Sequence, residues 1–237
     1  MPGESRRLAR LLAELAVIAV GVFVGLAADA AWEDRQERVR EQVYLREIRS
    51  ELLLAQEEIR VDNGRWRGWL AATDSLLAHF DSRSAADSVL NVWVQQATMY
   101  VARFNPPTSV MDELIASGNL SLLRSDQVRF GLLAYGQASE RLRFLENYLL
   151  TVREDGLRPY LTERFAWVTE VVSDEHPAPL PIEVSAWSDM LADPEFRNLL
   201  AVNRQRLRLV LNRSEELEEY IGALIQMTGS ELRPGAY

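Results

Sequence analysis

The stretch LLAELAVIAVGVFVGLAADAAW, residues 11–32, decides how the rest of the chain is interpreted. It contains only two charged residues, Glu14 and Asp29. As a helix that rises about 1.5 Å per residue it would be ~33 Å long, enough to cross the roughly 30 Å hydrocarbon core of a bilayer. Arg10 precedes its apolar part, and Trp32 closes it where an aromatic ring would meet lipid headgroups. The stretch therefore predicts one transmembrane helix.

Four residues of this stretch and its flank are predicted to lie at the membrane interfaces: Arg10, Glu14, Asp29 and Trp32. Glu14 and Asp29 would be about 22 Å apart along a helix, so neither reaches the bilayer centre, where a charge is expensive. Arg10 lies four residues before Glu14 on the same helix face and can neutralise it. A polar contact with a partner helix is the alternative role for the two acids.

Two other interpretations of residues 11–32 remain open. In a cleaved signal peptide, Ala28-Asp29-Ala30 would be the cleavage site. In a buried core helix, the uninterrupted apolar run would be only residues 15–28. The helical sequence that continues beyond Trp32 favours an uncleaved anchor, and the arginines that precede the stretch argue against a core helix.

Gly21 and Gly25 form a GxxxG motif within the apolar run. Two glycines one turn apart allow a second helix backbone to approach closely, as in many membrane helix pairs. We therefore expect Gly21 and Gly25 to be helix-packing residues, with a membrane-protein partner or a second copy of this chain.

Composition restricts the function classes. The chain has 237 residues and a formal net charge of −9, which argues against nucleic-acid binding. All 26 basic residues are Arg, which resembles a codon bias more than a functional choice. The chain has no Cys, so thiolate chemistry, disulfides and cysteine-based metal sites are excluded.

The chain divides into four predicted regions: a basic N-terminal tail (1–10), the transmembrane helix (11–32), an all-helical soluble domain (33–229) and a C-terminal tail (230–237). A short basic tail usually stays in the cytoplasm, which would place the C-terminal domain in the periplasm. Arg35, Arg38 and Arg40 on the other flank leave the orientation open.

Beyond Trp32 the chain predicts helices almost throughout. The first continues the transmembrane helix to a break near residues 81–84. Its apolar residues recur at helical spacing, and we expect them to form one buried stripe: Val39, Val43, Ile48, Leu52, Ala55, Ile59, Trp66, Trp69, Leu76 and Leu77. Further helices are predicted over residues 87–103, 109–118, 126–154, 159–172 and 193–228. No segment alternates with the period of two that is typical of strands.

Local signals predict where the helices begin and end. Ser109, followed three residues later by Asp112, resembles a capping box, and Ser125 is a predicted N-cap. Asp193 before Pro194 predicts an N-cap with proline at the first helical position. The structural turn Ser117-Gly118-Asn119 predicts a helix end with Gly118 in the left-handed conformation. Residues 176–181, with alternate prolines, predict a loop, and Gly229 predicts the end of the last helix.

Several of these segments resemble a known family. They are Glu14-Leu-Ala-Val-Ile-Ala-Val-Gly21, Asp29-Ala-Ala-Trp32-Glu33, Glu41-Gln-Val-Tyr44-Leu45, and the turn Leu114-Ile-Ala-Ser117-Gly118-Asn119-Leu120 before Leu132-Leu-Ala-Tyr135. Together they are similar to DUF6090, a family of bacterial single-span proteins of unknown function. The chain departs from that family at Ala13 and at Ala30-Ala31. The resemblance implies a retained inner-membrane anchor and a helical domain, and it transfers no catalytic residue.

No catalytic, cofactor-binding or metal-ligating residues are recognisable. The two histidines, His79 and His176, lack a neighbouring ligand at metal-binding spacing, and we expect both to be at least partly exposed. Phosphate-binding glycine loops and nucleophile motifs are absent from the sequence. The tryptophans after Trp32 could line a ligand groove, although core packing is the preferred interpretation: Trp66, Trp69, Trp93, Trp167 and Trp187.

The sequence therefore predicts a single-pass, all-α, non-enzymatic protein of the bacterial inner membrane that works as an interaction scaffold or accessory subunit. The alternative is a ligand-sensing helical domain coupled to the membrane helix, and the third possibility is an enzyme with an unrecognised site. A Trp-lined pocket with converging Arg residues would favour the sensor, and an apolar patch on the long helix would favour the scaffold.

Overall fold

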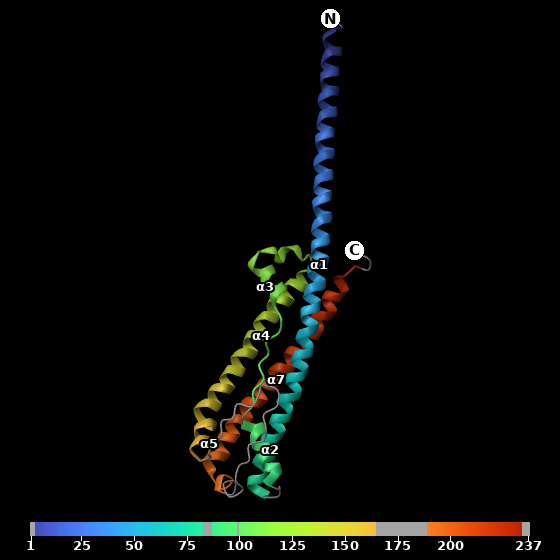
Figure 1. Ribbon diagram of the computed structural model, residues 1–237. Helices are drawn as coiled ribbons and strands as arrows, with labels where there is room; N and C mark the ends of the chain where they lie inside the picture. The colour runs from blue at the N-terminus through green and yellow to red at the C-terminus, as the bar shows by residue number, and fades with distance from the viewer. Residues whose placement is uncertain (1–2, 83–86, 99, 165–188, 234–237) are drawn as a thin grey trace.

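The computed structural model describes residues 3–82, 87–98, 100–164 and 189–233; for residues 3–14, 16, 82, 87–88 and 91 it describes the helical backbone only. Within these ranges the chain is helical, with no strand, as the sequence predicts. A long N-terminal helix runs into a helical bundle and projects far beyond it (Figure 1).

Helix α1 is a single unbroken helix, Gly3–Ser82. It ends where the sequence predicts a break, and its length confirms that the apolar stretch continues into the charged segment without a turn. Among the described side chains, which begin at Leu15, no helix combines the length and hydropathy that a membrane crossing requires. The structure therefore does not support the predicted transmembrane helix, although residues 11–14 and 16 lie outside the described side chains.

Three long helices form the bundle: the later part of α1, α4 (Asp126–Val152) and α7 (Pro194–Glu231). Figure 1 shows α4 running in the same direction as α1 and α7 returning beside both. Hydrogen bonds fix this antiparallel arrangement at both ends of α7, because Gln42 donates to the carbonyl of Glu231 at its end and Asp81 accepts from Arg197 near its start.

A heptad repeat explains why these helices pack. Core-facing residues recur at alternating intervals of three and four, the pattern of coiled-coil packing. In α1 they are residues 45, 48, 52, 55, 59, 62, 66, 69, 73 and 76; in α4, residues 128, 132, 135, 139, 142, 146, 149 and 153; in α7, residues 196, 200, 203, 207, 210, 214, 217, 221, 224 and 228. Most are apolar, and three of the polar exceptions, Glu146, Arg153 and Asn203, form buried polar contacts that are considered below.

The predicted stripe on α1 is partly wrong. Ile48, Leu52, Ala55 and Ile59 are buried as expected, but Val39 and Val43 are exposed. The buried face begins instead with Glu41, Gln42 and Leu45, because the polar pair is covered by neighbouring elements. Trp66, Trp69 and Trp93 contribute to the core, whereas Trp167 and Trp187 lie outside the described residues.

An extended connector, residues 100–108, lies between α1 and α4 (Figure 1). It is held by carboxylates from both helices. The Phe104 N–H donates to Glu146 of α4 at 3.2 Å, and the Asn105 N–H donates to Glu58 of α1 at 2.8 Å. The Phe104 ring is fully buried, so the connector replaces direct contact between the two helices with an inserted layer of side chains.

A second core cluster closes the end of the bundle farthest from the N-terminus. It joins α2 (Asp87–Thr98), α5 (Arg158–Arg164) and the start of α7 around Leu76 and Phe196. The ring of Phe196 stacks on Tyr160 at 5.4 Å between centroids. α2 ends earlier than its predicted end at Arg103, and α5 is described only to Arg164, so the rest of the helix predicted over 159–172 and the loop at 176–181 lie outside the described residues.

Four other local predictions can be compared with the structure: one is confirmed, and three need correction. Asp193 caps α7 by accepting the Glu195 N–H, as predicted. α7 passes through Gly229 and ends at Glu231, because its last turns stay packed on α1. The break predicted after residue 154 is absent: η2, a π-helical turn (Arg153–Leu157), joins α4 to α5 without interruption. The side chain of Ser125 makes no capping bond.

Candidate functional site

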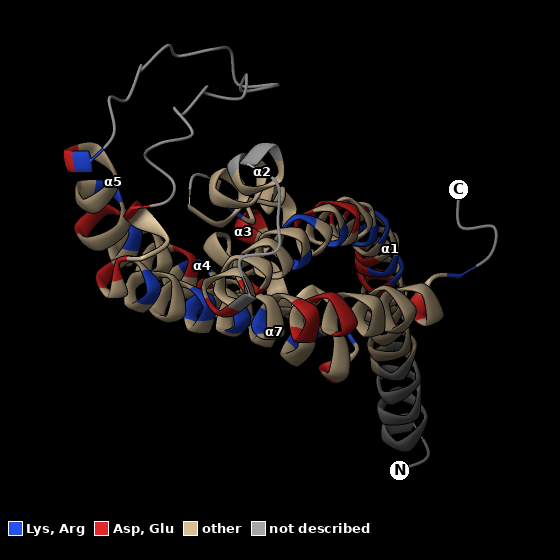
Figure 2. Ribbon diagram, turned by 90° about the horizontal axis from the view of Figure 1, so that it is seen from below, with Lys and Arg blue, Asp and Glu red and all other residues tan. Residues whose placement is uncertain are grey.

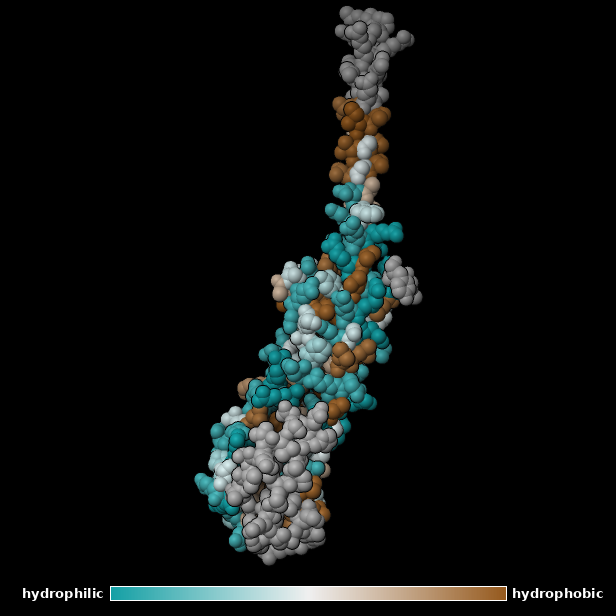
Figure 3. Space-filling model, viewed as in Figure 1, coloured by the Kyte–Doolittle hydropathy of each residue, from teal (hydrophilic) through white to brown (hydrophobic). Residues whose placement is uncertain are grey.

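The feature that distinguishes this fold is an apolar arm, residues 15–32 of α1, which lies outside the bundle (Figures 1 and 3). Every described side chain in it is exposed. Eight large apolar residues are between 58 and 74 % exposed: Leu15, Val17, Ile18, Val20, Val22, Phe23, Val24 and Leu26. They point in all directions around the helix, so the arm has no single face that a bundle helix could cover.

The predicted packing and interface residues lie on this arm. Gly21 and Gly25 are open, because a Cβ atom added at either would meet nothing within 4 Å. Trp32 is exposed at the end of the arm nearest the bundle, and Asp29 lies one turn before it. The side chains of Arg10 and Glu14 lie outside the described residues. The packing role of the two glycines stays a prediction.

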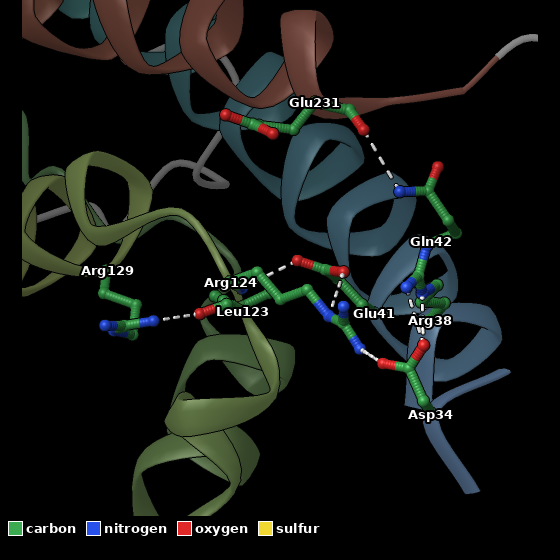
Figure 4. A network of polar contacts seen from close by, with 8 residues as sticks. All are labelled: Asp34, Arg38, Glu41, Gln42, Leu123, Arg124, Arg129 and Glu231. Carbon is green, nitrogen blue, oxygen red and sulfur yellow. Dashed lines mark hydrogen bonds and ion pairs between the residues drawn. The ribbon is translucent and has the colours of Figure 1, made fainter. Parts of the chain in front are cut away.

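A polar collar surrounds α1 where it enters the bundle: Asp34, Arg38, Glu41, Gln42, Arg124 and Glu231 (Figure 4). Asp34 pairs with two arginines: Arg38 Nε donates to it at 2.9 Å, and Arg124 reaches it from the segment before α4. These hydrogen bonds, chiefly that of Arg124, hold the pKa of Asp34 below its usual range. Asp34 is only half-exposed and stays ionised, so it fixes α4 to the base of the arm.

The next turn of α1 joins two further elements. Glu41 accepts the Arg124 N–H at 2.7 Å. Gln42 uses both ends of its amide: it donates to the Glu231 carbonyl at 3.1 Å and accepts the Arg233 N–H at 2.8 Å. The collar therefore ties α1, the start of α4 and the end of α7 together, so the arm is rigidly continuous with all three (Figure 4).

The structural turn at Ser117-Gly118-Asn119 lies beside this collar, between α3 (Ser109–Ala116) and η1 (Asn119–Leu122). Gly118 has φ = 72°, which confirms the predicted left-handed conformation. The predicted capping box at Ser109 is wrong. Thr108 is the N-cap, and Glu51 of α1 accepts both the Ser109 hydroxyl at 2.7 Å and the Val110 N–H at 2.9 Å. Only the tertiary fold brings that carboxylate to the start of α3.

A buried arginine occupies the far half of the bundle. Arg153 Nε donates to Asn203 Oδ1 at 2.9 Å, and its terminal nitrogens donate to the carbonyls of Ala97 and Tyr100. Asn203 donates to the same Ala97 carbonyl at 2.8 Å. Arg153 forms no ion pair with any acid in the described ranges, and burial lowers the pKa of its guanidinium to about 10. These bonds satisfy backbone carbonyls that α2 leaves at its end.

Glu146 lies one heptad before Arg153 and is also buried. Burial raises the pKa of its carboxyl to about 7, and the Phe104 N–H partly offsets this effect. Arg153 and Glu146 therefore hold the two ends of the same segment, residues 97–104. Neither contact was predicted from the sequence, because Arg153 and Glu146 look like residues of a charged helix surface until the heptad register is known.

Catalytic chemistry finds no support among the described residues. They contain no group of three or more His, Asp or Glu side chains that could hold a metal ion. His79 is buried, which contradicts the predicted exposure; it lies at the end of α1, beside the second core cluster. His176 lies outside the described residues. A hollow beside Trp32 is lined by Arg35, Gln36, Val39 and Arg40, all from α1, so no second element closes it around a ligand.

Comparison with protein-family models, with curated proteins and with solved structures finds no match for this chain. The resemblance to the single-span family therefore stays a prediction from its motifs.

Proposed function

We propose that this chain is a non-enzymatic, membrane-anchored scaffold or accessory protein of the bacterial inner membrane. The observation that carries the proposal is the arm. A helix that is apolar on every side and packs against nothing in its own chain requires an apolar environment around it. Lipid supplies that environment, and the proposed span begins before the described side chains, at Leu11. The collar then marks where the bundle meets the membrane surface.

An interaction role follows from the rest of the molecule. Trp66, Trp69 and Trp93 pack in the core clusters, which favours a scaffold over a sensor with a Trp-lined groove. The outer face of α1 exposes apolar side chains within the bundle, among them Val43, Leu54 and Val61. Such a patch on a long helix fits a protein partner better than a small ligand. The bundle is proposed to lie in the periplasm, because the short basic N-terminal tail favours the cytoplasm.

Membrane association is tested with the full chain in a bacterial host. Membranes washed with alkaline carbonate should retain the protein, and its intact mass should include Met1. Val20→Arg together with Val24→Arg should release a large fraction of it, because two charges within the span cost several kcal/mol. The matched control, Val43→Arg with Val61→Arg, changes two exposed valines of the bundle and should leave retention unchanged. A mature N-terminus at Ala31, or full release of the parent chain, would refute the anchor.

Orientation can be measured cleanly because the chain has no Cys. Single cysteines at Ser5 and at exposed Ser50 provide one reporter on each side of the arm. A membrane-impermeant maleimide applied to intact spheroplasts should label the Ser50→Cys variant and leave Ser5→Cys unlabelled. The opposite pattern would place the bundle in the cytoplasm.

A further inference from the structure

The outer side of α4 carries an apolar stripe that the bundle does not use. Phe130 and Phe144 are 68 and 69 % exposed, and Leu133 and Tyr148 are partly exposed between and beyond them. These residues lie opposite the buried heptad positions of the same helix. The two phenylalanines are about 21 Å apart along α4, which corresponds to four helical turns.

Helix α7 extends this stripe into a two-helix face. α4 and α7 are closely packed, since a Cβ atom at Gly131 would lie 2.6 Å from Leu224 and one at Gly156 would lie 3.0 Å from Leu199. In this antiparallel register the guanidinium of Arg206 covers the Tyr148 ring at 4.4 Å, and exposed Leu209 lies one turn further along α7, toward the level of Phe144. We call this surface the α4–α7 face: Phe130, Arg141, Phe144, Tyr148, Arg206 and Leu209.

Its charge differs from that of the rest of the molecule. The chain has a net charge of −9, and the collar arginines Arg38 and Arg124 are paired with acids. Arg141 and Arg206 form no ion pair with any described residue. The α4–α7 face therefore combines exposed aromatic rings with two cations that form no ion pair among the described residues. Exposed Glu140, one turn before Phe144, lies 3.7 Å from Arg143, and Figure 2 shows both basic and acidic residues along the two helices.

We infer that the α4–α7 face binds an acidic amphipathic helix of a partner protein. This inference rests on the proposed scaffold function and specifies the chemistry of its partner. Such a helix would lie in the direction of α4 and α7 as an additional helix of the bundle. Its apolar side chains would cover Phe144 and Phe130, and its Glu and Asp side chains would pair with Arg141 and Arg206.

Two other occupants fit the geometry less well. The lipid surface is one: Phe130 lies only about 9 Å along the chain from Arg124 of the collar, but the rest of the face on α4, from Arg141 to Tyr148, lies about 25–36 Å from it, too far from the base of the arm for contact with headgroups. A second copy of the chain is the other. Two copies anchored in one membrane by parallel arms would be related by an axis along those arms, which places Arg141 near its own counterpart, a repulsive contact.

The first experiment measures binding to the full chain in detergent or nanodiscs. The probes are two designed 21-residue helical peptides with identical leucine stripes, one with Glu and one with Lys at the flanking positions. Fluorescence anisotropy should show the Glu peptide binding at least about ten-fold more tightly than the Lys peptide, with affinity falling as salt rises. Equal affinities, or no binding of either peptide, would overturn the inference.

Variants assign the binding to this face. Phe144→Ser should weaken binding of the Glu peptide about ten-fold, as should the double variant Arg141→Gln and Arg206→Gln. The matched control, Val89→Ser with Arg40→Gln, changes exposed residues of α2 and α1 and should bind as the parent does. Unchanged melting temperatures show that the variants fold. Variants that bind like the parent chain would place the peptide elsewhere and refute the inference.

A second experiment identifies the natural occupant. A photo-crosslinking amino acid at position 144, in the full chain within living cells, should yield a product whose crosslinked peptide is acidic, amphipathic and from another protein. A crosslink to a second copy, or to the chain's own acidic residues 165–188, would overturn the inference. The carbonate wash separates the two proposals: retention without peptide binding refutes this inference alone, and peptide binding with release from membranes refutes the anchor alone.

Discussion

The two halves of α1 belong to one helix, but one half packs in the bundle and the other half is exposed. Residues 45–76 alternate buried and exposed positions with a heptad period, so one face packs on α7 and on the connector. Residues 15–32 have no such period, and all their described side chains remain exposed. Helix formation is local and depends on propensity and on the absence of breakers. Whether a helix packs into the bundle depends on the period of its apolar residues, because the bundle can cover only one face of a helix.

The largest expected difference between the two halves of α1 is in the stability that is lost when a tryptophan is replaced. Trp66 is fully buried, and Trp66→Ala should lower the free energy of unfolding by about 3–5 kcal/mol through lost contacts and a cavity. Trp32→Ala in the arm should leave it within about 0.5 kcal/mol. Urea unfolding of the full chain in mild detergent, followed by circular dichroism, measures both. A comparable loss for the two variants would mean that the arm contributes to the bundle's stability.

Replacing the buried Arg153 is expected to cause a smaller loss of stability. Arg153→Met keeps most of the apolar volume but leaves the Ala97 and Tyr100 carbonyls and Asn203 without their donor. We expect a loss of roughly 2–3 kcal/mol in the same unfolding assay. The control Arg158→Met removes an exposed arginine five residues further on, whose only ion pair within the described part of the chain is with Glu154, and should cost less than about 0.5 kcal/mol. If the two variants were equally stable, the bonds of Arg153 would contribute nothing.

The buried carboxyl predicts a pH dependence that the arm does not share. Burial raises the pKa of Glu146 from its ordinary value of 4.5 to about 7 in the folded state, so the folded chain holds a proton that the unfolded chain releases. The free energy of unfolding should therefore fall as the pH rises from about 5 to about 8, by on the order of 2 kcal/mol. Burial also raises the pKa of Asp62 on α1, which adds a slope of the same sign.

Glu146→Gln tests this assignment because it keeps the oxygen that accepts the Phe104 N–H and removes the titration. Its unfolding free energy should depend on pH less steeply than that of the parent chain, with the remaining slope attributable to Asp62. Identical pH profiles for the two chains would show that Glu146 does not titrate in this range.

The smallest loss of stability is expected from a substitution in the turn beside the collar. Gly118 has a positive φ, and open space surrounds it, so Gly118→Val meets no clash but resists the left-handed backbone. It should cost roughly 1 kcal/mol or more, visible as a lowered thermal midpoint. Gly118→Asn, which tolerates this conformation, should restore most of that loss. An unshifted midpoint for Gly118→Val would mean that the turn rearranges freely.

Local signals predicted much of the fold. The all-helical class, the single helix from the arm to residue 82, the left-handed Gly118 and the Asp193 cap all follow from residues within a few positions of one another. The arm was also visible, because an apolar run is a property of consecutive residues. The apolar arm is therefore the part of the candidate site that could be predicted from the sequence.

The predictions that were wrong depended on residues far apart in the chain. The sequence placed Val39 and Val43 in the core, and only the partners of Glu41 and Gln42 show that the buried face starts on the other side of the helix. Likewise, Glu51 caps a helix that begins 58 residues later in the chain. A polar residue in a helix looks solvated until its partner is known.

The sequence by itself determined that this chain forms long helices and that one end of the first helix is apolar on all sides, since both depend on local composition and period. The tertiary structure alone decided which face of each helix is buried, how the connector is held, and that Arg141, Phe144 and Arg206 share a surface. The physical reason is that burial, hydrogen-bond partners and surface charge are set by contacts between residues far apart in the chain, and these contacts exist only after the helices have packed.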